Sequence, residues 1–340
     1  MGARTILFIR TDRLGETVLN LPAVAALDAA WPDATITLLV HPELGELVAR
    51  ARGVDRVLTY PAGPGPWWVQ ALRLRALLAP QRFDVAVISN PTKALHVGVW
   101  LAGIPRRVGY GSTGGGFLLT DEATLSPEAH ESEHALNLFR AIGIHPQEYR
   151  PQLYISEAEK KAFDEKFHAW GAKNDGIYVG LQIDAGTPSK EWPKASIEKF
   201  MQVFVERFPD VTLVTDGTQE DKMDEIRSRV GVKFVNGVGR TTPRELSVLL
   251  NRLAFFIGPD SGPAHIAAAL GIPTLFLYSG TNDRRRWRPL SEAAVVLRHE
   301  VPCSPCALKV CNVEGHPCMS GISPEEVLKA AEPLLERKIV

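Results

Sequence analysis

Apolar positions along the chain fall into two alternating patterns. Short continuous apolar runs, such as Arg4–Arg10 and Thr35–Val40, are separated by longer stretches, such as Thr17–Trp31, in which apolar residues recur every three or four positions. Continuous runs of this length are typical of strands buried on both faces, and the wider spacing is typical of helices with one buried face. The alternation predicts right-handed βαβ units in a parallel sheet.

In the N-terminal half the pattern predicts five strands and four helices. The strands are Arg4–Arg10, Thr35–Val40, Asp55–Thr59, Asp84–Ser89 and Arg107–Tyr110, and the helices are Thr17–Trp31, Leu44–Arg50, Trp67–Leu78 and Thr92–Ala102. The C-terminal half repeats the alternation after an amphipathic helix, Ser156–Trp170, which has a serine at its capping position. Its strands are Ile177–Gln182, Val211–Thr215, Phe234–Asn236, Phe255–Ile257 and Thr274–Leu277, and its helices are Ala195–Arg207, Asp221–Val230, Pro243–Asn251, Gly262–Leu270 and Ser323–Arg337.

The two halves therefore predict an α/β protein with two Rossmann-like domains that face each other, each built on a parallel sheet. We expect an N-terminal domain over residues 1–153, a connector helix over 154–175, a C-terminal domain over 176–322 and a C-terminal helix over 323–340. A length of 340 residues suits two domains of ordinary size. In such sheets ligands bind at the carboxyl ends of the strands, so the loops that follow strands are the candidate sites.

Composition excludes several function classes. Apolar residues make up 45% and charged residues 23% of the chain, as in globular proteins, and the net charge of −1 gives no global sign of a nucleic acid partner. No apolar run approaches the roughly 20 residues needed to span a bilayer, and the apolar part of MGARTILFIR is too short for a signal peptide. These features predict a cytoplasmic protein without a transmembrane segment.

One strand-to-helix loop, GPDSGPAH at 258–265, carries several polar groups where a helix is expected to begin. Unpaired backbone N–H groups at Ser261 and Gly262 would bind an anion such as phosphate, and Asp260 would accept hydrogen bonds from sugar hydroxyls. The alternative is that Asp260 or Ser261 only caps the helix and that His265 is a packed helix residue.

Two further loops of the C-terminal half have similar chemistry. IDAGTPSKEWP carries Thr187 and Lys190 just before a helix, and TDGTQEDK carries Glu220 and Asp221. Each loop alone is compatible with an exposed surface loop, but the three together predict a pocket for a nucleotide diphosphate-sugar. The G-x-G-x-x-G fingerprint of dinucleotide-binding enzymes is absent after Arg4–Arg10, which argues against a dehydrogenase.

The first N-terminal loop, RTDRLGETVLNLPAV, places Glu16 at the start of a helix. A carboxylate there is a candidate general base for a sugar hydroxyl, and Asp12 is a competing candidate. The alternative is that Glu16 only interacts favourably with the helix dipole. Arg10 and Arg13 are candidates for binding an anionic acceptor, or are solvated.

The segments RTDRLGETVLNLPAVAALDAAWPDATITLLV, GIPRRVGY, SKEWP and DSGPAHIAAALGIPTLFLYSGTND resemble the ADP-heptose:lipopolysaccharide heptosyltransferases of glycosyltransferase family 9, in order and over nearly the whole chain. The resemblance implies a GT-B fold and an inverting, metal-independent transfer of heptose from ADP-L-glycero-D-manno-heptose. It implies as acceptor the Kdo-lipid A or the heptosylated inner core of lipopolysaccharide, reached at the cytoplasmic face of the inner membrane.

The resemblance also assigns residues. Glu16 corresponds to the catalytic base, which is mostly Asp in the family, Lys190 to the lysine that contacts the diphosphate, and Glu220 to the carboxylate that binds the ribose. Thr187 lies in a loop that departs from the commoner family pattern. The sugar-phosphate loop corresponds to Asp260, Ser261, Gly262 and His265. Two alternatives stay open: a family member with another glycan or a protein as acceptor, and a sugar-nucleotide-binding protein without transfer activity.

All four cysteines lie in one segment, CSPCALKVCNVEGHPC. Cys303, Cys306, Cys311 and Cys318 have a spacing that suits a tetrahedral zinc or iron site, with His316 as a substitute ligand. Such a site would be structural, and no cofactor is expected for catalysis. The alternative is a loop with four reduced thiols, because structural disulfides are disfavoured in the cytoplasm.

Overall fold

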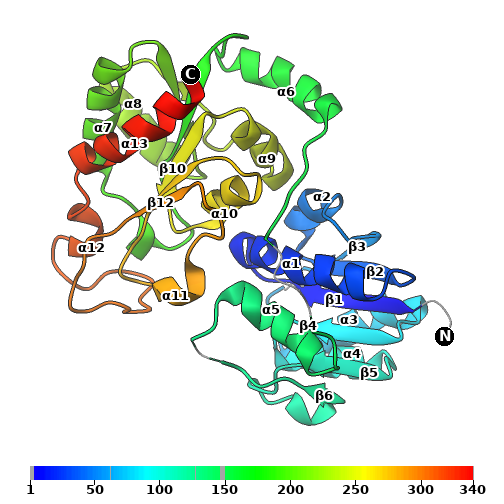
Figure 1. Cartoon of the computed structure of the whole chain (residues 1–340). Helices are drawn as coiled ribbons and strands as arrows, with labels where there is room; N and C mark the ends of the chain where they lie inside the picture. Colours follow the sequence, from blue (N-terminus) through cyan, green and yellow to red (C-terminus); the bar gives the residue numbers. More distant parts are fainter. Residues whose placement is uncertain (1–3, 62, 127, 146–149, 340) are drawn as a thin grey trace. The chain divides into compact units, whose positions relative to one another are not determined.

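The computed structural model describes residues 4–61, 63–126, 128–145 and 150–339, and the chain divides into two compact units, Met1–Leu153 and Tyr154–Val340 (Figure 1). Each unit contains one six-stranded sheet. The strand orders are β3-β2-β1-β4-β5-β6 and β12-β11-β10-β7-β8-β9. Numbered within its own unit, each sheet has the order 3-2-1-4-5-6, and all the strand pairs are parallel. This is the doubly wound Rossmann arrangement, so the predicted fold class is confirmed.

The first unit contains every strand and helix that the apolar pattern predicts for it. Its strands are β1 (Thr5–Arg10), β2 (Thr35–Val40), β3 (Arg56–Thr59), β4 (Val85–Ile88), β5 (Arg106–Gly109) and β6 (Asp121–Glu122). Its α-helices are α1 (Leu14–Ala30), α2 (Gly45–Val48), α3 (Trp67–Leu78), α4 (Lys93–Leu101) and α5 (Glu131–Arg140), and its 3₁₀ turns are η1 (Pro42–Leu44), η2 (Ala79–Gln81) and η3 (Gly116–Leu118). The pattern did not predict α5 and β6. Helix α1 begins three residues before its predicted start, because its first turn, which contains Gly15 and Glu16, is buried without being apolar.

Side chains of β1 alternate between the two faces of the first sheet. Leu7 and Ile9 belong to a core that includes Leu74 of α3 and Val99 of α4. Phe8 points to the other face, where its ring lies 6.2 Å from that of Phe139 in α5. Helices α3 and α4 therefore cover one face, and α5 lies on the other together with α1, which it contacts.

Close packing of α3 against α4 depends on one glycine. A Cβ atom added to Gly98 of α4 would lie 2.7 Å from Leu74 Cδ2 and 3.0 Å from the carbonyl oxygen of Ala71, both in α3. A larger residue at position 98 would push the two helices apart, so the pair forms a tightly packed platform on the sheet.

The second unit contains all its predicted elements, and strand β12 and the short helices η4, α11 and α12 are additional to the prediction. The strands are β7 (Ile177–Gln182), β8 (Val211–Asp216), β9 (Val235–Asn236), β10 (Phe255–Pro259), β11 (Thr274–Leu277) and β12 (Ala294–Leu297). The helices are η4 (Pro188–Lys190), α6 (Glu157–Ala169), α7 (Lys194–Arg207), α8 (Glu220–Val230), α9 (Pro243–Asn251), α10 (Gly262–Ala269), α11 (Arg284–Trp287), α12 (Pro317–Ser320) and α13 (Pro324–Ile339).

Helix α6 packs on α9 within this second unit. Ser156 caps α6 in a capping box with Glu159, and Arg244 of α9 lies 2.7 Å from the same carboxylate. Burial acts to raise the pKa of Glu159, but the hydrogen bonds from Ser156 and Arg244 outweigh it and bring that pKa to about 2. Helices α7, α8 and α13 cover one face of the second sheet, and their apolar residues, including Phe200, form one core with the strands.

The longest helices of the structure are short compared with a membrane-spanning helix, as expected from a sequence without long apolar runs. Helix α1 has 17 residues and α13 has 16. Within the described ranges, no helix has both the length and the apolar character required to cross a bilayer.

Candidate active site

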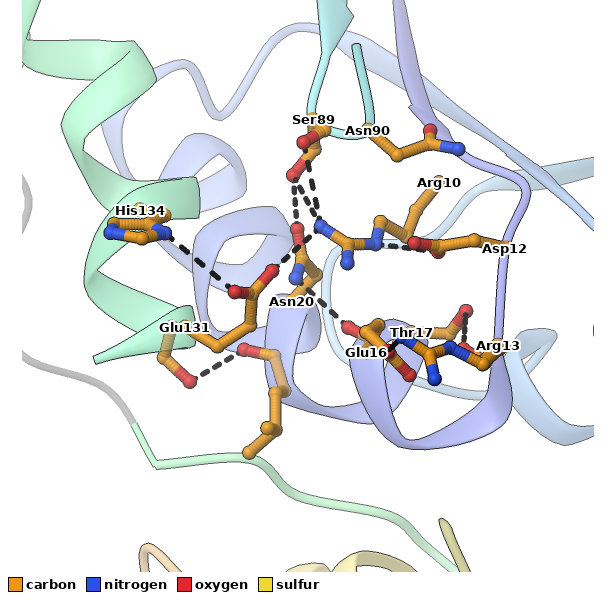
Figure 2. Close-up of polar contacts among 12 residues, drawn as sticks. Arg10, Asp12, Arg13, Glu16, Thr17, Asn20, Ser89, Asn90, Glu131 and His134 are labelled. Carbon is orange, nitrogen blue, oxygen red and sulfur yellow. Dashed lines mark hydrogen bonds and ion pairs between the residues drawn. The ribbon is translucent and has the colours of Figure 1, made fainter. Parts of the chain in front are cut away.

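Polar side chains gather where β1 and β4 end (Figure 2). Arg10, the last residue of β1, is only 5% exposed, and its Nε lies 2.7 Å from Asp12 Oδ1. Its Nη1 lies 2.9 Å from Glu131 Oε1 and donates to the carbonyl and hydroxyl oxygens of Ser89 at 3.4 Å. Glu131 also lies 3.6 Å from His134 Nδ1. The guanidinium proposed from the sequence as an acceptor ligand is thus engaged by two carboxylates of its own unit.

Glu16 lies in the first turn of α1 with its side chain 9% exposed. Its Oε1 is 2.6 Å from Nη2 of Arg13, whose own side chain is 74% exposed. The side chain of Arg13, at the N-cap, caps no N–H group of α1, so the start of this helix has no side-chain cap. The Glu16 carboxylate therefore lies at the start of α1 in contact with the Arg13 guanidinium group.

A second contact fixes the turn that carries Glu16. Asn20 Nδ2 donates to the carbonyl oxygen of Glu16 at 2.9 Å, and the Ser89 hydroxyl makes a very short hydrogen bond to Asn20 Oδ1. Ser89 follows β4, so the start of α1 is tied to the ends of both central strands (Figure 2).

In the second unit the predicted donor residues lie together around Asp260. Lys190 Nζ lies 3.0 Å from the carbonyl oxygen and 3.2 Å from Oδ2 of Asp260. Asn282 Nδ2 donates to the same Oδ2 at 2.6 Å, and His265 Nε2 lies 3.4 Å from Oδ1. Burial acts to raise the pKa of Asp260, but its contacts with His265, Lys190 and Asn282 outweigh burial and hold that pKa below its ordinary value. Asp260 is therefore a buried, ionised carboxylate.

The N-terminus of α10 has no side-chain cap. Ser261 occupies the N-cap position, but its hydroxyl donates to Gln182 Oε1 at 2.7 Å. The alternative interpretation, in which Asp260 or Ser261 serves only as a helix cap, does not match these contacts. Because Pro263 has no N–H, the backbone N–H groups of Ser261 and Gly262 are the ones available to an anion, next to Asp260 and its partner Lys190.

Two buried aspartates that the sequence analysis did not single out lie at the ends of β7 and β8. Asp184 Oδ2 accepts from the backbone N–H groups of Thr218 and Gln219 at 2.6 and 2.8 Å, which orders the loop before α8. A Cβ at Gly217 would lie 2.8 Å from this oxygen. Burial, together with the charge of Asp184, raises the pKa of Asp216 to about 7. Glu220, the predicted ribose ligand, is the first residue of α8 and is exposed.

All four cysteines line one cavity of about 190 Å³, together with His316 and Ser189. Burial raises the pKa of the Cys318 thiol, and the other three cysteines act in the same direction. Among the described residues, no three Cys, His, Asp or Glu side chains are gathered as a ready metal site.

The cysteine segment also contacts the loop that carries Lys190. Ser189 donates through its backbone N–H to the carbonyl oxygen of Lys309 at 3.0 Å and through its hydroxyl to that of Leu308 at 2.5 Å. His316 Nε2 lies 2.9 Å from the Ser189 carbonyl oxygen. The segment therefore supports one side of the predicted donor site, a link that the sequence analysis missed.

Comparison with known proteins gives the family. The sequence profile of glycosyltransferase family 9 (heptosyltransferase) matches residues 71–316. The chain belongs to this family.

Individual members resemble this family 9 glycosyltransferase over nearly its whole length. Lipopolysaccharide heptosyltransferase 3 of Escherichia coli strain K12 is 26% identical over 345 residues, which cover 94% of this chain and 95% of that protein. The solved structure of E. coli ADP-heptose lps heptosyltransferase II matches with a TM-score of 0.81 at 23% identity, covering 99% of this chain and 100% of that one. The iron-containing dodecameric glycosyltransferase TibC of enterotoxigenic E. coli H10407 matches with a TM-score of 0.63 at 12% identity, covering 100% and 78%. At these identities the structural matches show the fold.

The structure of this family 9 glycosyltransferase separates the predicted residues into two groups. Glu16, Arg13 and Asp12 lie at the start of α1 in the first unit, whereas the loops that carry Lys190, Asp260 and Thr187 belong to the second. Thr187 is half-buried at the N-cap of η4, where its side chain makes no capping hydrogen bond. The sequence analysis missed Asn282, Asp184 and Glu131. Asp184 and Asn282 lie in the loops that follow β7 and β11, and this position could have identified them as candidate site residues.

Proposed function

We propose that this family 9 glycosyltransferase transfers heptose from ADP-L-glycero-D-manno-heptose to the inner core of lipopolysaccharide, either Kdo-lipid A or an already heptosylated core. The main support is the arrangement of Lys190, Asp260 and His265 beside the uncapped N-terminus of α10, because it offers a cation and free N–H groups to a diphosphate. The printed name of the E. coli relative, a lipopolysaccharide heptosyltransferase, supports the choice of sugar and acceptor.

On the donor side, the N–H groups at the start of α10 and the Lys190 ammonium group would bind the diphosphate. Negative charge develops on the leaving phosphate oxygen as the bond to the anomeric carbon breaks, so these donors would stabilise the transition state more than the bound donor. Asp260 would keep Lys190 in place through the contacts of 3.0 and 3.2 Å that the structure contains. With these groups balancing the charge, the proposed chemistry needs no metal ion. Glu220 and Thr187 would contact the ribose and the phosphates.

On the acceptor side, Glu16 would act as general base. The acceptor hydroxyl oxygen forms a bond to the anomeric carbon while the bond from that carbon to the phosphate oxygen breaks, the proton passes to Glu16, and ADP leaves. Attack opposite to the leaving group inverts the anomeric centre. Arg13, with its exposed side chain, is the better candidate for an anionic acceptor group, whereas buried Arg10 would position Asp12 and Glu131.

The decisive experiment separates donor binding from transfer. We expect Glu16→Gln to keep ADP affinity within a few-fold and to lower turnover by ~10²–10⁴, the usual range for loss of a general base. Asp12→Asn is the matched control, and its turnover should stay within a few-fold of the wild type. If Glu16→Gln kept full turnover, the base would be another group. If the wild-type protein bound ADP-heptose but transferred heptose to no member of a panel of truncated lipopolysaccharide acceptors, the proposed acceptor class would be wrong.

We also propose that the protein works at the cytoplasmic face of the inner membrane as a peripheral protein. The argument is chemical: the proposed acceptor is linked to a lipid, whereas the donor is a water-soluble nucleotide sugar. Fractionation of cells should then recover part of the protein with the inner membrane at low salt and release it at high salt. Complete recovery in the soluble fraction at low salt would contradict this location.

A structural zinc or iron ion at the cysteine cavity is a further proposal. Four thiols around one small cavity have the donor chemistry that both metals accept, and TibC, which shares the fold, is described as iron-containing. Cys303, Cys306, Cys311 and Cys318 would hold the ion, and their segment would support the Lys190 loop through Ser189. Its role would be to stabilise this segment, not to react with substrate.

Elemental analysis of protein purified under reducing conditions should find about one zinc or iron per chain. Cys306→Ser should lose the metal and lower the melting temperature, whereas the control Val310→Ser, at an exposed position of the same segment, should do neither. Metal-free protein with four titratable thiols and an unchanged melting temperature would leave the plain thiol loop as the correct interpretation.

A further inference from the structure

Large apolar side chains are exposed on one part of the first unit. They belong to α3, α4 and η3, and are between 42% and 85% exposed: Trp67, Trp68, Leu72, Trp100 and Phe117. They are half of the ten large apolar side chains found exposed among the described residues, and they include three of the seven tryptophans of the chain. Scattered exposed apolar residues are normal, but a concentration of aromatic rings on neighbouring elements indicates a contact surface.

The elements that carry these side chains are neighbours. Helices α3 and α4 lie side by side (Figure 1), and η3 contacts α4. The Lys93 ammonium group of α4 lies 4.1 Å from the centre of the Trp67 ring of α3, which links the starts of the two helices. Trp68 and Leu72 are four residues apart and both exposed, so they share one exposed side of α3, whereas Leu74 and Leu78 are buried.

Basic residues outnumber acidic ones in this part of the chain. Residues 61–122 contain six basic residues and three acidic ones, a net charge of +3 in a chain of −1, and Arg106 forms an ion pair with Asp121. Arg73, Arg75 and Lys93 are exposed, and in the described part of the chain no ion pair involves them. The surface is therefore apolar, aromatic and positively charged at the same time.

These properties fit an anionic lipid surface. Tryptophan concentrates at the boundary between lipid headgroups and acyl chains, and nearby lysine and arginine side chains gain about 1 kcal/mol each from anionic headgroups. A protein partner could use the same aromatic residues, but it would have to supply the compensating acidic groups, which a bilayer with anionic headgroups supplies in any orientation. Charge complementarity therefore favours lipid.

We propose that a docking face on the first unit binds the anionic surface of a membrane. The docking face consists of Trp67, Trp68, Leu72, Arg73, Arg75, Lys93, Trp100 and Phe117. The inference builds on the proposed function, since a lipid-linked acceptor requires the enzyme to work at a bilayer. It is specific to one surface, however, and it can be tested without donor or acceptor.

The test is flotation of the full chain with vesicles of phosphatidylcholine alone or with added phosphatidylglycerol. The wild type should float with the anionic vesicles at low salt and be released by salt. Trp68→Ser combined with Leu72→Ser should weaken binding at least tenfold, because each side chain loses apolar contact with the interface. Arg73→Gln combined with Arg75→Gln should also weaken binding about tenfold or more and reduce its salt dependence.

Controls separate a loss of membrane binding from a loss of folding or of catalytic activity. Val295→Ser combined with Val310→Ser changes exposed apolar residues of the second unit and should leave vesicle binding unchanged. The docking-face variants should keep their melting temperature, ADP affinity and turnover on a detergent-dispersed acceptor, and lose turnover on an acceptor embedded in vesicles. Wild-type protein that does not float with anionic vesicles would overturn the proposal. Self-association that Trp68→Ser abolishes, without vesicle binding, would assign this surface to a second copy of the chain instead.

Discussion

Replacing Asp216 by asparagine tests the most unusual carboxyl group of the second unit. Asp216 ends β8, is fully buried, and has a pKa raised from 3.8 to about 7 by burial and by the charge of Asp184. The unfolded chain releases this proton near pH 4, whereas the folded protein holds it until about pH 7. The folded state thus binds the extra proton between these two values, and the contribution of Asp216 to stability falls as the pH rises through this window.

The magnitude follows from the two pKa values. One pKa unit corresponds to about 1.4 kcal/mol, so the difference between 3.8 and about 7 amounts to about 4 kcal/mol of destabilisation once both states are ionised. About 3 kcal/mol of this penalty develops between pH 5 and pH 8. An asparagine has no charge to bury and can accept the same hydrogen bond from the Gly217 backbone N–H. Asp216→Asn should therefore gain about 3 kcal/mol relative to the wild type on going from pH 5 to pH 8.

Backbone hydrogen exchange measures this quantity in the right part of the molecule. Because the chain has two units, a single denaturation curve does not isolate the second unit, whereas protection of amides in β7 and β8 does. Any cost of burying the new amide NH₂ group is independent of pH, so the change between the two pH values is the diagnostic result.

A matched control is available on the neighbouring helix. Asp221→Asn changes an exposed carboxylate in the first turn of α8, and its effect should stay within about 0.5 kcal/mol at both pH values. If Asp216→Asn and the wild type differed by the same amount at pH 5 and pH 8, the carboxyl would titrate normally and the reasoning from burial would be refuted.

Three further outcomes are expected. Lys190→Ala should weaken ADP binding and lower turnover by ~10²–10³, measured by calorimetry and by heptose transfer, because the leaving diphosphate loses a cation; unchanged turnover would remove Lys190 from the donor site. Arg10→Gln should destabilise the first unit by about 3–5 kcal/mol in hydrogen exchange, because it removes the cation that faces both Asp12 and the buried carboxylate of Glu131; Glu131→Gln in the same chain should recover part of the loss. The wild type should keep full turnover in EDTA provided that its melting temperature is unchanged, and rescue of lost turnover by Mg²⁺ would contradict the metal-independent mechanism.

Local patterns in the sequence determined most of the secondary structure. Apolar spacing predicted the exact bounds of five elements: β2, β7, β11, α3 and α9. Each of them buries apolar residues at the spacing typical of its type. Helix α5 escaped prediction because its first turn is buried through polar groups: Glu131 pairs with Arg10, and Ser132 donates to the Leu19 carbonyl oxygen. The apolar pattern identifies residues that are buried because they are apolar. It does not identify polar residues that are buried because their hydrogen bonds are satisfied. Strand β12 lies at a sheet edge and is apolar throughout (AVVL), so its signal was present in the sequence although the strand was not predicted.

The chemistry of each site depended on the tertiary structure. The sequence placed Lys190 and Asp260 in one predicted pocket, but their direct contact of 3.2 Å depends on the parallel strand order, because the two residues are 70 positions apart. The sequence suggested Arg10 as a ligand of the acceptor, but in the structure its guanidinium group forms an ion pair with Glu131 of α5, a helix far along the chain. Local sequence sets which residues alternate between buried and exposed faces, because that depends on neighbours a few positions away. The pairing of charged side chains depends on strand order and helix packing, because these bring segments that are distant in the sequence together.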